Sequence, residues 1–215
     1  MEENCINDLL KVTLIFIGIF IIQSMVYWGT QFLVKNPHML GSKLDDKIPF
    51  IPVFIFPYVI WFVLLFTIQF VLYFYSLQTY ALYVMSLFIV DITSGIIYLV
   101  YPTTFNRPYP EGDSFSVKVV RFIYSHDKKI LSCLPSLHCS LSTLFILSAL
   151  YATGLPLFLK LIIIIFSLLV IVSTVFVKQH VIIDVITAIP LAVISWYIAM
   201  AIGADTFLTF FNFIQ

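Results

Sequence analysis

Six long apolar stretches separated by polar connections dominate the pattern of this chain. They cover residues 9–34, 50–75, 79–101, 137–152, 157–177 and 181–202, of which 137–152 is the shortest. A helix needs about 20 apolar residues to cross the hydrocarbon layer of a bilayer. The pattern therefore predicts an all-α polytopic membrane protein, a six-transmembrane-helix bundle that forms a single domain over residues 1–215.

The long connection, residues 102–135, contains one further amphipathic segment at 114–124. Its apolar side chains recur at helical spacing with two cations between them: Phe115, Val119, Phe122 and Ile123, with Lys118 and Arg121. A short basic helix with one apolar face is typical of a helix that lies on the membrane surface. We therefore expect one interfacial helix in this connection.

Composition agrees with a chain embedded in lipid. Hydrophobic residues make up 61% of the chain and charged residues 10%, and the mean hydropathy is +1.07. Soluble domains carry about 25% charged residues, so this composition fits a polytopic membrane protein far better than a soluble core. The formal net charge is zero and no basic cluster occurs, so we expect no nucleic-acid partner.

The polar connections divide unevenly between the two sides of the predicted bundle. An even number of crossings separates residues 35–49, residues 102–135 and the turn at Lys178, so all three lie on one side. Every Lys and Arg except Lys11 and Lys160 lies on that side. The positive-inside rule places such a side in the cytoplasm.

Two polar segments on that side have the chemistry of an anion site. Arg107 follows the third stretch, and its planar fork of donors suits phosphate oxygens, although a single arginine there is also typical of a headgroup anchor. Ser136 and His138 stand where the fourth helix should begin. A helix start offers unpaired N–H groups and the positive end of the dipole, both of which attract anions.

The third polar segment pairs an imidazole with a carboxylate. His180 and Asp184 are four residues apart and therefore share one helix face. A carboxylate that accepts one imidazole N–H fixes the tautomer and leaves the other nitrogen free as a nucleophile or ligand. An acid inside an apolar run favours a functional role. Asp91, in the middle of the third stretch, is interpreted instead as a structural polar contact.

Taken in chain order, these motifs resemble the type 2 phosphatidic acid phosphatase superfamily. They are Arg-Pro at Arg107, Pro-Ser-x-His ending at His138, and His-x-x-x-Asp beginning at His180. The variant Pro-Ser-Leu-His, together with residues 44–52 and with Tyr58 and Trp61 behind them, is similar to the branch related to inositol phosphorylceramide synthases. The resemblance covers roughly residues 40–200.

The resemblance implies a phosphoryl transfer that needs no metal or other cofactor and passes through a phosphohistidine. His180 would be the nucleophile, Asp184 its orienting acid, and His138 the proton donor to the leaving group. Arg107, Ser136 and nearby backbone N–H groups would hold the phosphate.

The chain departs from the family pattern at two cations. Val100 stands where the first motif begins with lysine, and Thr174 stands where the third motif has arginine. Lys178, two residues before His180, is hypothesised to replace one of them.

From the motifs we expect a lipid phosphate phosphohydrolase acting on phosphatidic acid, a polyprenyl diphosphate or a similar amphiphile. Transfer to a hydroxyl acceptor differs from hydrolysis only in the acceptor, so a lipid phosphotransferase remains an alternative. A non-catalytic lipid-binding protein is a further alternative, because the two cations are missing. A zinc site built from His138, His180 and Asp184 ranks lower, since no comparable ligand spacing occurs.

The family places its site outward. We therefore expect the site on the extracytoplasmic face of the plasma membrane, although the distribution of Lys and Arg points the other way. Cys133 and Cys139 are expected to be small apolar residues near a helix start, with a disulfide between them left open.

Overall fold

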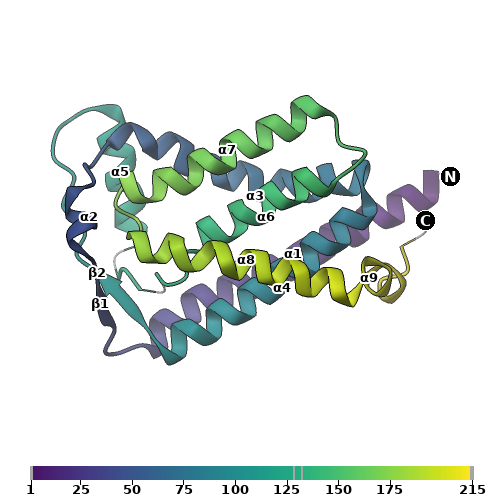
Figure 1. The fold of residues 1–215 in the computed structure, drawn as a ribbon, viewed down its shortest axis with the longest axis horizontal. Coiled ribbons are helices and arrows are strands. Elements are labelled where there is room, and N and C mark those ends of the chain that lie inside the picture. The colour runs from purple at the N-terminus through teal and green to yellow at the C-terminus, as the bar shows by residue number, and fades with distance from the viewer. Residues whose placement is uncertain (1, 128, 132, 214–215) are drawn as a thin grey trace.

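The apolar stretches form long helices that run side by side in one bundle (Figure 1). The computed structural model describes residues 2–127, 129–131 and 133–213, without the side chains of residues 2–5. The long helices are α1 (Glu2–Leu33), α3 (Ile55–Tyr75), α4 (Leu77–Val100), α6 (Leu137–Tyr151), α7 (Leu157–Phe176) and α8 (Ile182–Ile202). Each predicted stretch therefore corresponds to one helix. The largest shift in a boundary on the polar side is at α3, which begins after a short 3₁₀ turn, η1 (Pro52–Phe54).

Five of these helices are long and apolar enough to cross a membrane, namely α1, α3 with η1, α4, α7 and α8. The sixth, α6, has 15 residues, which at 1.5 Å per residue gives about 22 Å against a hydrocarbon layer of about 30 Å. Helices α3, α4, α7 and α8 all pack against α6, and most of its side chains are buried. The chain is thus an all-α integral membrane protein whose shortest bundle helix is enclosed by the others.

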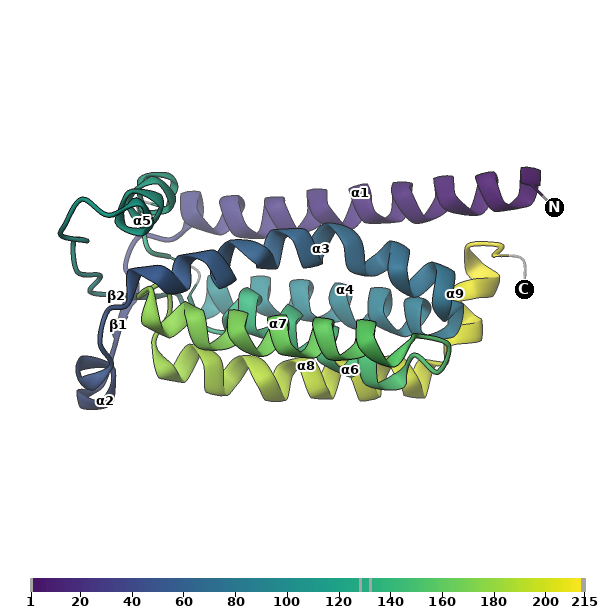
Figure 2. The same cartoon turned by 90° about the horizontal axis from the view of Figure 1, so that it is seen from above.

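Helix α1 lies along the edge of the bundle, next to α3 and α4 (Figure 2). Large apolar side chains such as Leu14, Met25 and Phe32 are exposed on it and would face lipid. Its inner side carries Gln23, whose Nε2 donates to Oδ1 of Asp91 on α4 at 3.4 Å. Both side chains are buried, so Asp91 takes part in a polar contact between α1 and α4.

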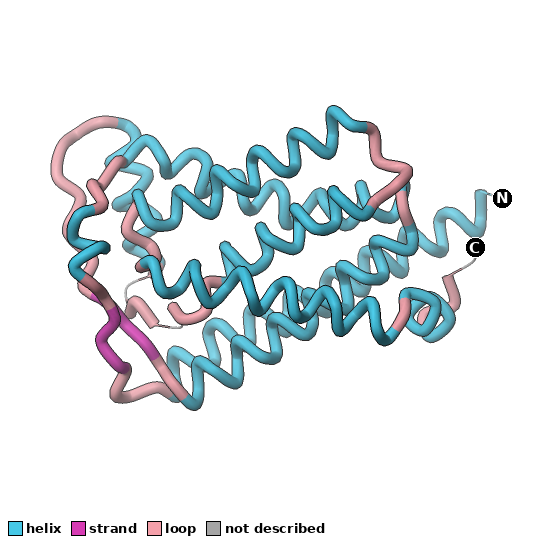
Figure 3. The backbone as a smooth tube through the Cα atoms, in the orientation of Figure 1, coloured by secondary structure: helices cyan, strands magenta, loops and turns pink. Residues whose placement is uncertain are grey.

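One end of the bundle carries the small elements and the longest loops. Strands β1 (His38–Leu40) and β2 (Thr103–Phe105) pair in parallel there, with α2 (Lys43–Lys47) and α5 (Phe115–His126) beside them (Figure 3). The turn between α7 and α8 lies at the same end (Figure 1), which confirms that the three polar connections share one side. Helix α9 (Ala204–Phe210) and both chain ends lie at the opposite end. The sequence analysis missed the strands and α9.

Helix α5 confirms the helix predicted within the long connection, and Ser114 caps its first turn. Its buried side chains are Val117 and Val120, of which Val120 packs with residues of α3 and with Val177. Phe115 and Phe122, which the sequence placed on the apolar face, are exposed instead. The helix therefore uses one apolar side to attach to the bundle and leaves two phenylalanines free to contact lipid.

The loop between α6 and α7 passes very close to the end of α3. An added Cβ at Gly154 would overlap the carbonyl oxygen of Tyr75, whereas a Cβ at Gly18 on α1 would meet nothing within 4 Å. We predict that Gly154→Ala destabilises the purified protein by about 1–3 kcal/mol, the usual cost of overpacking. Thermal unfolding in detergent measures this, with Gly18→Ala as the matched control. Equal melting temperatures for the two variants would contradict this packing.

Candidate active site

Hydrogen bonds join the three polar segments, residues 101–108, 133–139 and 178–184, at the loop-rich end of the bundle. The backbone N–H of Leu134 donates to Oγ1 of Thr103 at 3.2 Å, which links the second segment to the first. The backbone N–H of Ser136 donates to the carbonyl of Asp184 at 3.2 Å, which links the second segment to the third. The hydroxyl of Tyr98 on α4 donates to the carbonyl of Pro135 at 2.7 Å. The start of α6 is therefore fixed against both α4 and α8.

His180 and Asp184 form the pair that their spacing predicts. Nδ1 of His180 lies 3.0 Å from Oδ2 of Asp184, and the same oxygen accepts the backbone N–H of Val181 at 3.1 Å. Asp184 is fully buried. Because a carboxylate only accepts, Nδ1 carries the shared proton, which in a neutral ring leaves the lone pair on Nε2.

A tight turn presents the ring of His180. The carbonyl of Thr174 accepts the backbone N–H groups of both Gln179 and His180, at 2.9 and 3.1 Å. Lys178 in this turn has a positive φ of 50°. The side chain of Gln179 is buried, and its Nε2 has no hydrogen-bond partner in the described part of the chain. The turn therefore places the imidazole of His180 beside the side-chain amide of Gln179, whose Nε2 is available to donate a hydrogen bond.

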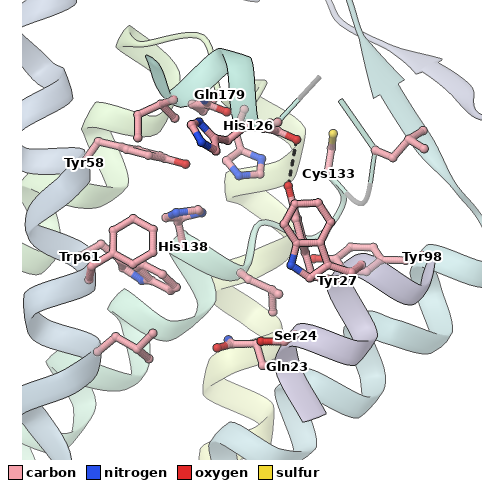
Figure 4. Close-up of a pocket in the computed structure, with 18 of the residues that line it drawn as sticks. Gln23, Ser24, Tyr27, Tyr58, Trp61, Tyr98, His126, Cys133, His138 and Gln179 are labelled. Carbon is pink, nitrogen blue, oxygen red and sulfur yellow. Dashed lines mark hydrogen bonds between the residues drawn. The ribbon is translucent and has the colours of Figure 1, made fainter. Parts of the chain in front are cut away.

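His138 is the second residue of α6 and faces His180, with 5.9 Å between the ring centroids. Its ring lies between Tyr58 and Trp61 of α3, with centroid distances of 4.6 and 4.3 Å (Figure 4). Its Nε2 has no hydrogen-bond partner among the described residues. The two imidazoles are therefore close enough to act on one small group, and among the described residues only His180 of the two is paired with a carboxylate.

Arg107 reaches the same place from the loop after β2. Its side chain is only 4% exposed, and Nη2 lies 2.6 Å from Oδ2 of Asp127. Its guanidinium also stacks on the ring of Tyr124, 4.4 Å from the centroid. Burial raises the pKa of Tyr124 to about 12, so the phenol stays neutral. Asp127, whose Oδ1 accepts the hydroxyl of Tyr27 on α1 at 2.9 Å, was not among the predicted site residues.

An inner cavity of about 300 Å³ lies beside these groups. Its lining includes Arg107, His138, Gln179 and His180, which form what we call its polar end, together with apolar side chains of α1 and α3 such as Phe20 and Leu65. Figure 4 shows this cavity, with Gln23 and Ser24 of α1 on the side away from Gln179. Beyond the polar end, the lining therefore combines apolar side chains with the two polar residues Gln23 and Ser24.

An outer hollow of about 720 Å³ lies on the other side of Arg107 and His180. Its polar lining comes from α2 and neighbouring loops and comprises Ser42, Lys43, Asp45, Asp46, Asn106 and Lys178. Arg107 and His180 line both the inner cavity and the outer hollow. These two side chains therefore stand between a largely apolar space and a polar one.

Two predicted phosphate ligands lie away from the inner cavity. The ammonium group of Lys178 donates to the carbonyls of Asp45 and Ile48, at 2.9 and 2.6 Å, and so holds α2. Ser136 is fully buried, and its Oγ accepts the backbone N–H of Cys139 as the cap of α6. Lys178 lines the outer hollow together with His180, whereas Ser136 lines neither space.

The positions of the two missing family cations do not face the inner cavity. Val100 ends α4 and is 77% exposed. Thr174 is fully buried, and its hydroxyl donates to the carbonyl of Ile171 at 2.7 Å.

In the described part of the chain, no group of three or more His, Cys, Asp or Glu side chains is placed to hold a metal ion. Cys133 and Cys139 are both buried free thiols, so they form no disulfide. Burial raises the pKa of the Cys133 thiol well above its usual value, which keeps it protonated.

No protein-family model matches the chain, and the comparisons with curated proteins and with solved structures find no match either. The function proposed below therefore depends on the site geometry together with the motif resemblance.

A substitution at Lys178 tests whether the ammonium group of this lysine holds α2 in place. We predict that Lys178→Met speeds tryptic cleavage after Lys43 or Lys47 by about 3- to 10-fold, because a charged hydrogen-bond donor to α2 is lost and local opening becomes easier. Lys35→Met is the control, since Lys35 is exposed at the same end of the bundle. Cleavage at the parent rate in Lys178→Met would mean that the lysine does not hold α2.

Proposed function

We propose that this chain is an integral-membrane lipid phosphate phosphohydrolase that acts through a phosphohistidine. One observation carries the proposal: His138, His180 and Arg107 line the same cavity as apolar side chains of α1 and α3, with the two imidazole centroids 5.9 Å apart. A phosphorylated amphiphile matches that distribution, with its headgroup among the cation and imidazoles and its tail along α1 and α3. Phosphatidic acid and polyprenyl diphosphates belong to this class.

In the first step, Nε2 of His180 attacks phosphorus. A nitrogen–phosphorus bond forms as the bond from phosphorus to the ester oxygen breaks, and His138 gives its proton to that oxygen, so the lipid alcohol leaves neutral. Asp184 stabilises the positive charge that develops on the phosphorylated imidazole through the hydrogen bond at Nδ1. Such a reaction depends mainly on charge stabilisation and in-line positioning.

In the second step, water takes the place vacated by the alcohol. His138, now neutral, accepts a proton from this water as the oxygen–phosphorus bond forms and the bond to Nε2 of His180 breaks. Inorganic phosphate leaves, and both imidazoles regain their starting protonation. One group thus acts as acid and then as base, as microscopic reversibility requires.

The phosphate oxygens have donors available in the same place. A guanidinium has five N–H donors, and Asp127 accepts from two of the nitrogens of Arg107, so further donors remain. Leu137 and His138 begin α6, and the first N–H groups of a helix have no partner within it. The positive end of the α6 dipole therefore faces the polar end of the inner cavity.

A lipid phosphotransferase is the second candidate, and the outer hollow favours it. Water as an acceptor occupies about 30 Å³, whereas the outer hollow measures about 720 Å³ and has a polar lining of both charge signs. A polyol of several hydroxyl groups would fit such a space next to His180.

The experiment measures phosphate release from a short-chain phosphatidic acid by the purified full chain. We predict that His180→Ala lowers turnover by about 10³-fold or more, because the nucleophile is lost. His38→Ala is the comparison variant, since His38 is an exposed histidine of β1 that lines neither the inner cavity nor the outer hollow. We expect it to keep most of the activity.

Four outcomes separate the candidate functions. Free phosphate as the sole product supports hydrolysis, and a phosphorylated polyol formed when glycerol or inositol is added supports transfer. A His180→Ala protein as active as the parent contradicts both. Absence of turnover in the parent on every lipid phosphate tried would instead favour the non-catalytic lipid-binding alternative.

We further propose that the loop-rich end, and hence the site, faces outward from the plasma membrane. An impermeant maleimide added to intact cells should then label Glu111→Cys, in the exposed loop before α5, and spare Thr153→Cys, exposed at the opposite end. Unmodified parent protein gives the background, since its described cysteines are buried. Labelling of Thr153→Cys alone would place the site in the cytoplasm, as the positive-inside rule expects.

A further inference from the structure

We propose that Tyr58 and Trp61 are positioning residues for His138: their rings hold the imidazole toward His180 and stabilise its protonated form. This inference rests on the proposed function, in which His138 protonates the leaving alcohol. It gives two residues of α3 a role in the reaction, although none of the three motifs lies on α3.

The geometry places His138 between the two rings. Tyr58 and Trp61 are three residues apart on α3 and so share one helix face. The ring of Tyr58 is stacked on that of His138 with 26° between the planes, and the ring of Trp61 is tilted by 42° (Figure 4). Both aromatic side chains are buried, with exposures of 5% and 6%. They leave the imidazole of His138 little freedom to turn away.

Aromatic rings are also suited to a cation at this position. The face of an aromatic ring carries partial negative charge and attracts a cation that lies over it. An imidazolium in an apolar surrounding loses hydration, and two ring faces offset part of that cost. Asp184 is bonded to His180, and no described carboxylate lies within ion-pair distance of His138. The two ring faces are therefore described contacts of His138 that suit its charged form better than aliphatic side chains would.

If the two rings act through His138, the loss of rate on removing them should depend on the leaving group of the substrate. An alkyl phosphate expels a poor leaving group that needs a proton, whereas a nitrophenyl phosphate expels a stable phenolate that does not. Loss of His138, or of the rings that position it, should slow the first step for the alkyl substrate and spare the aryl substrate. A change that only alters the shape of the cavity would have no reason to distinguish them.

The test compares dodecyl phosphate with 4-nitrophenyl phosphate in rapid-quench experiments on the full chain in detergent. The readout is the initial burst of released dodecanol or nitrophenol, which reports the first step alone. For dodecyl phosphate, we expect His138→Ala to slow the burst by about 100-fold or more, and Trp61→Leu and Tyr58→Leu by about 5- to 30-fold. For nitrophenyl phosphate, all three should stay within about 3-fold of the parent.

Conservative variants and a distant aromatic complete the set. Tyr58→Phe and Trp61→Phe keep a ring over His138 and should restore most of the dodecyl rate, which also guards against a leucine variant that fails to fold. Phe74→Leu, on the same helix but 62% exposed, is the matched control. We expect it to leave both rates unchanged.

The outcomes are distinguishable. Equal loss on both substrates in Trp61→Leu and Tyr58→Leu, or no loss on either, overturns the positioning role while His138→Ala still separates the substrates. If His138→Ala itself fails to separate them, His138 is not the proton donor and the inference falls. If His180→Ala is as active as the parent, the proposed function falls and takes the inference with it.

Discussion

The site depends on where α6 begins. This helix is shorter than the hydrocarbon layer is thick, and its first turn is held by the bond from the N–H of Ser136 to the carbonyl of Asp184. That bond joins the start of α6 to the first turn of α8 and so couples the positions of His138 and His180. Arg107 lies with these two imidazoles at the polar end of the inner cavity.

Polar groups inside the bundle fall into two classes. Some buried hydroxyl groups on the helices bond to carbonyls of the preceding turn, as Thr143 does to Cys139 at 2.8 Å, and Oδ1 of Asp91 is bonded to Gln23. Lipid offers no alternative partner to such groups. Several buried polar atoms without partners among the described residues gather instead around the imidazoles. They are Nε2 of His138, Nε2 of Gln179, Nε of Arg107 and Oδ1 of Asp184. A group of uncommitted donors and acceptors at a cavity is typical of a ligand site.

The sequence was sufficient to predict where the helices lie and that the three motifs come together. It was not sufficient to predict which other residues contact those motifs. Apolar runs fix where helices lie in lipid, and the His180–Asp184 pair follows from helical spacing alone. The position of α1 at the edge, by contrast, depends on packing that an apolar run does not encode. Asp127 stands beside Lys128 and Lys129 in the chain, so its sequence context is typical of a solvated loop, yet it pairs with Arg107 across the fold.

Other features escaped prediction for similar reasons. Strands of three residues, such as β1 and β2, carry too little pattern to be identified, and α9 follows an apolar run with only Gly203 between them. The hydrogen-bond partners of the Lys178 side chain were not predictable from the sequence. A lysine two residues before a histidine gives no sign that its ammonium group will donate to the carbonyls of Asp45 and Ile48. Tyr58 and Trp61 on α3 belong to an apolar run in the sequence. Only the fold shows that the ring of His138 lies between theirs.

The most direct measurement is a search for phosphate on the enzyme. His138→Ala should still accept phosphate from 4-nitrophenyl phosphate, since that leaving group needs no proton, but it should lose the base that activates water in the second step. Mass spectrometry of the quenched protein should then find an acid-labile phosphate accumulating on His180, and none in the His138→Ala/His180→Ala double variant. Phosphate on another residue, or none while nitrophenol is still released, would contradict the phosphohistidine and the convergence of the two imidazoles on one phosphorus atom.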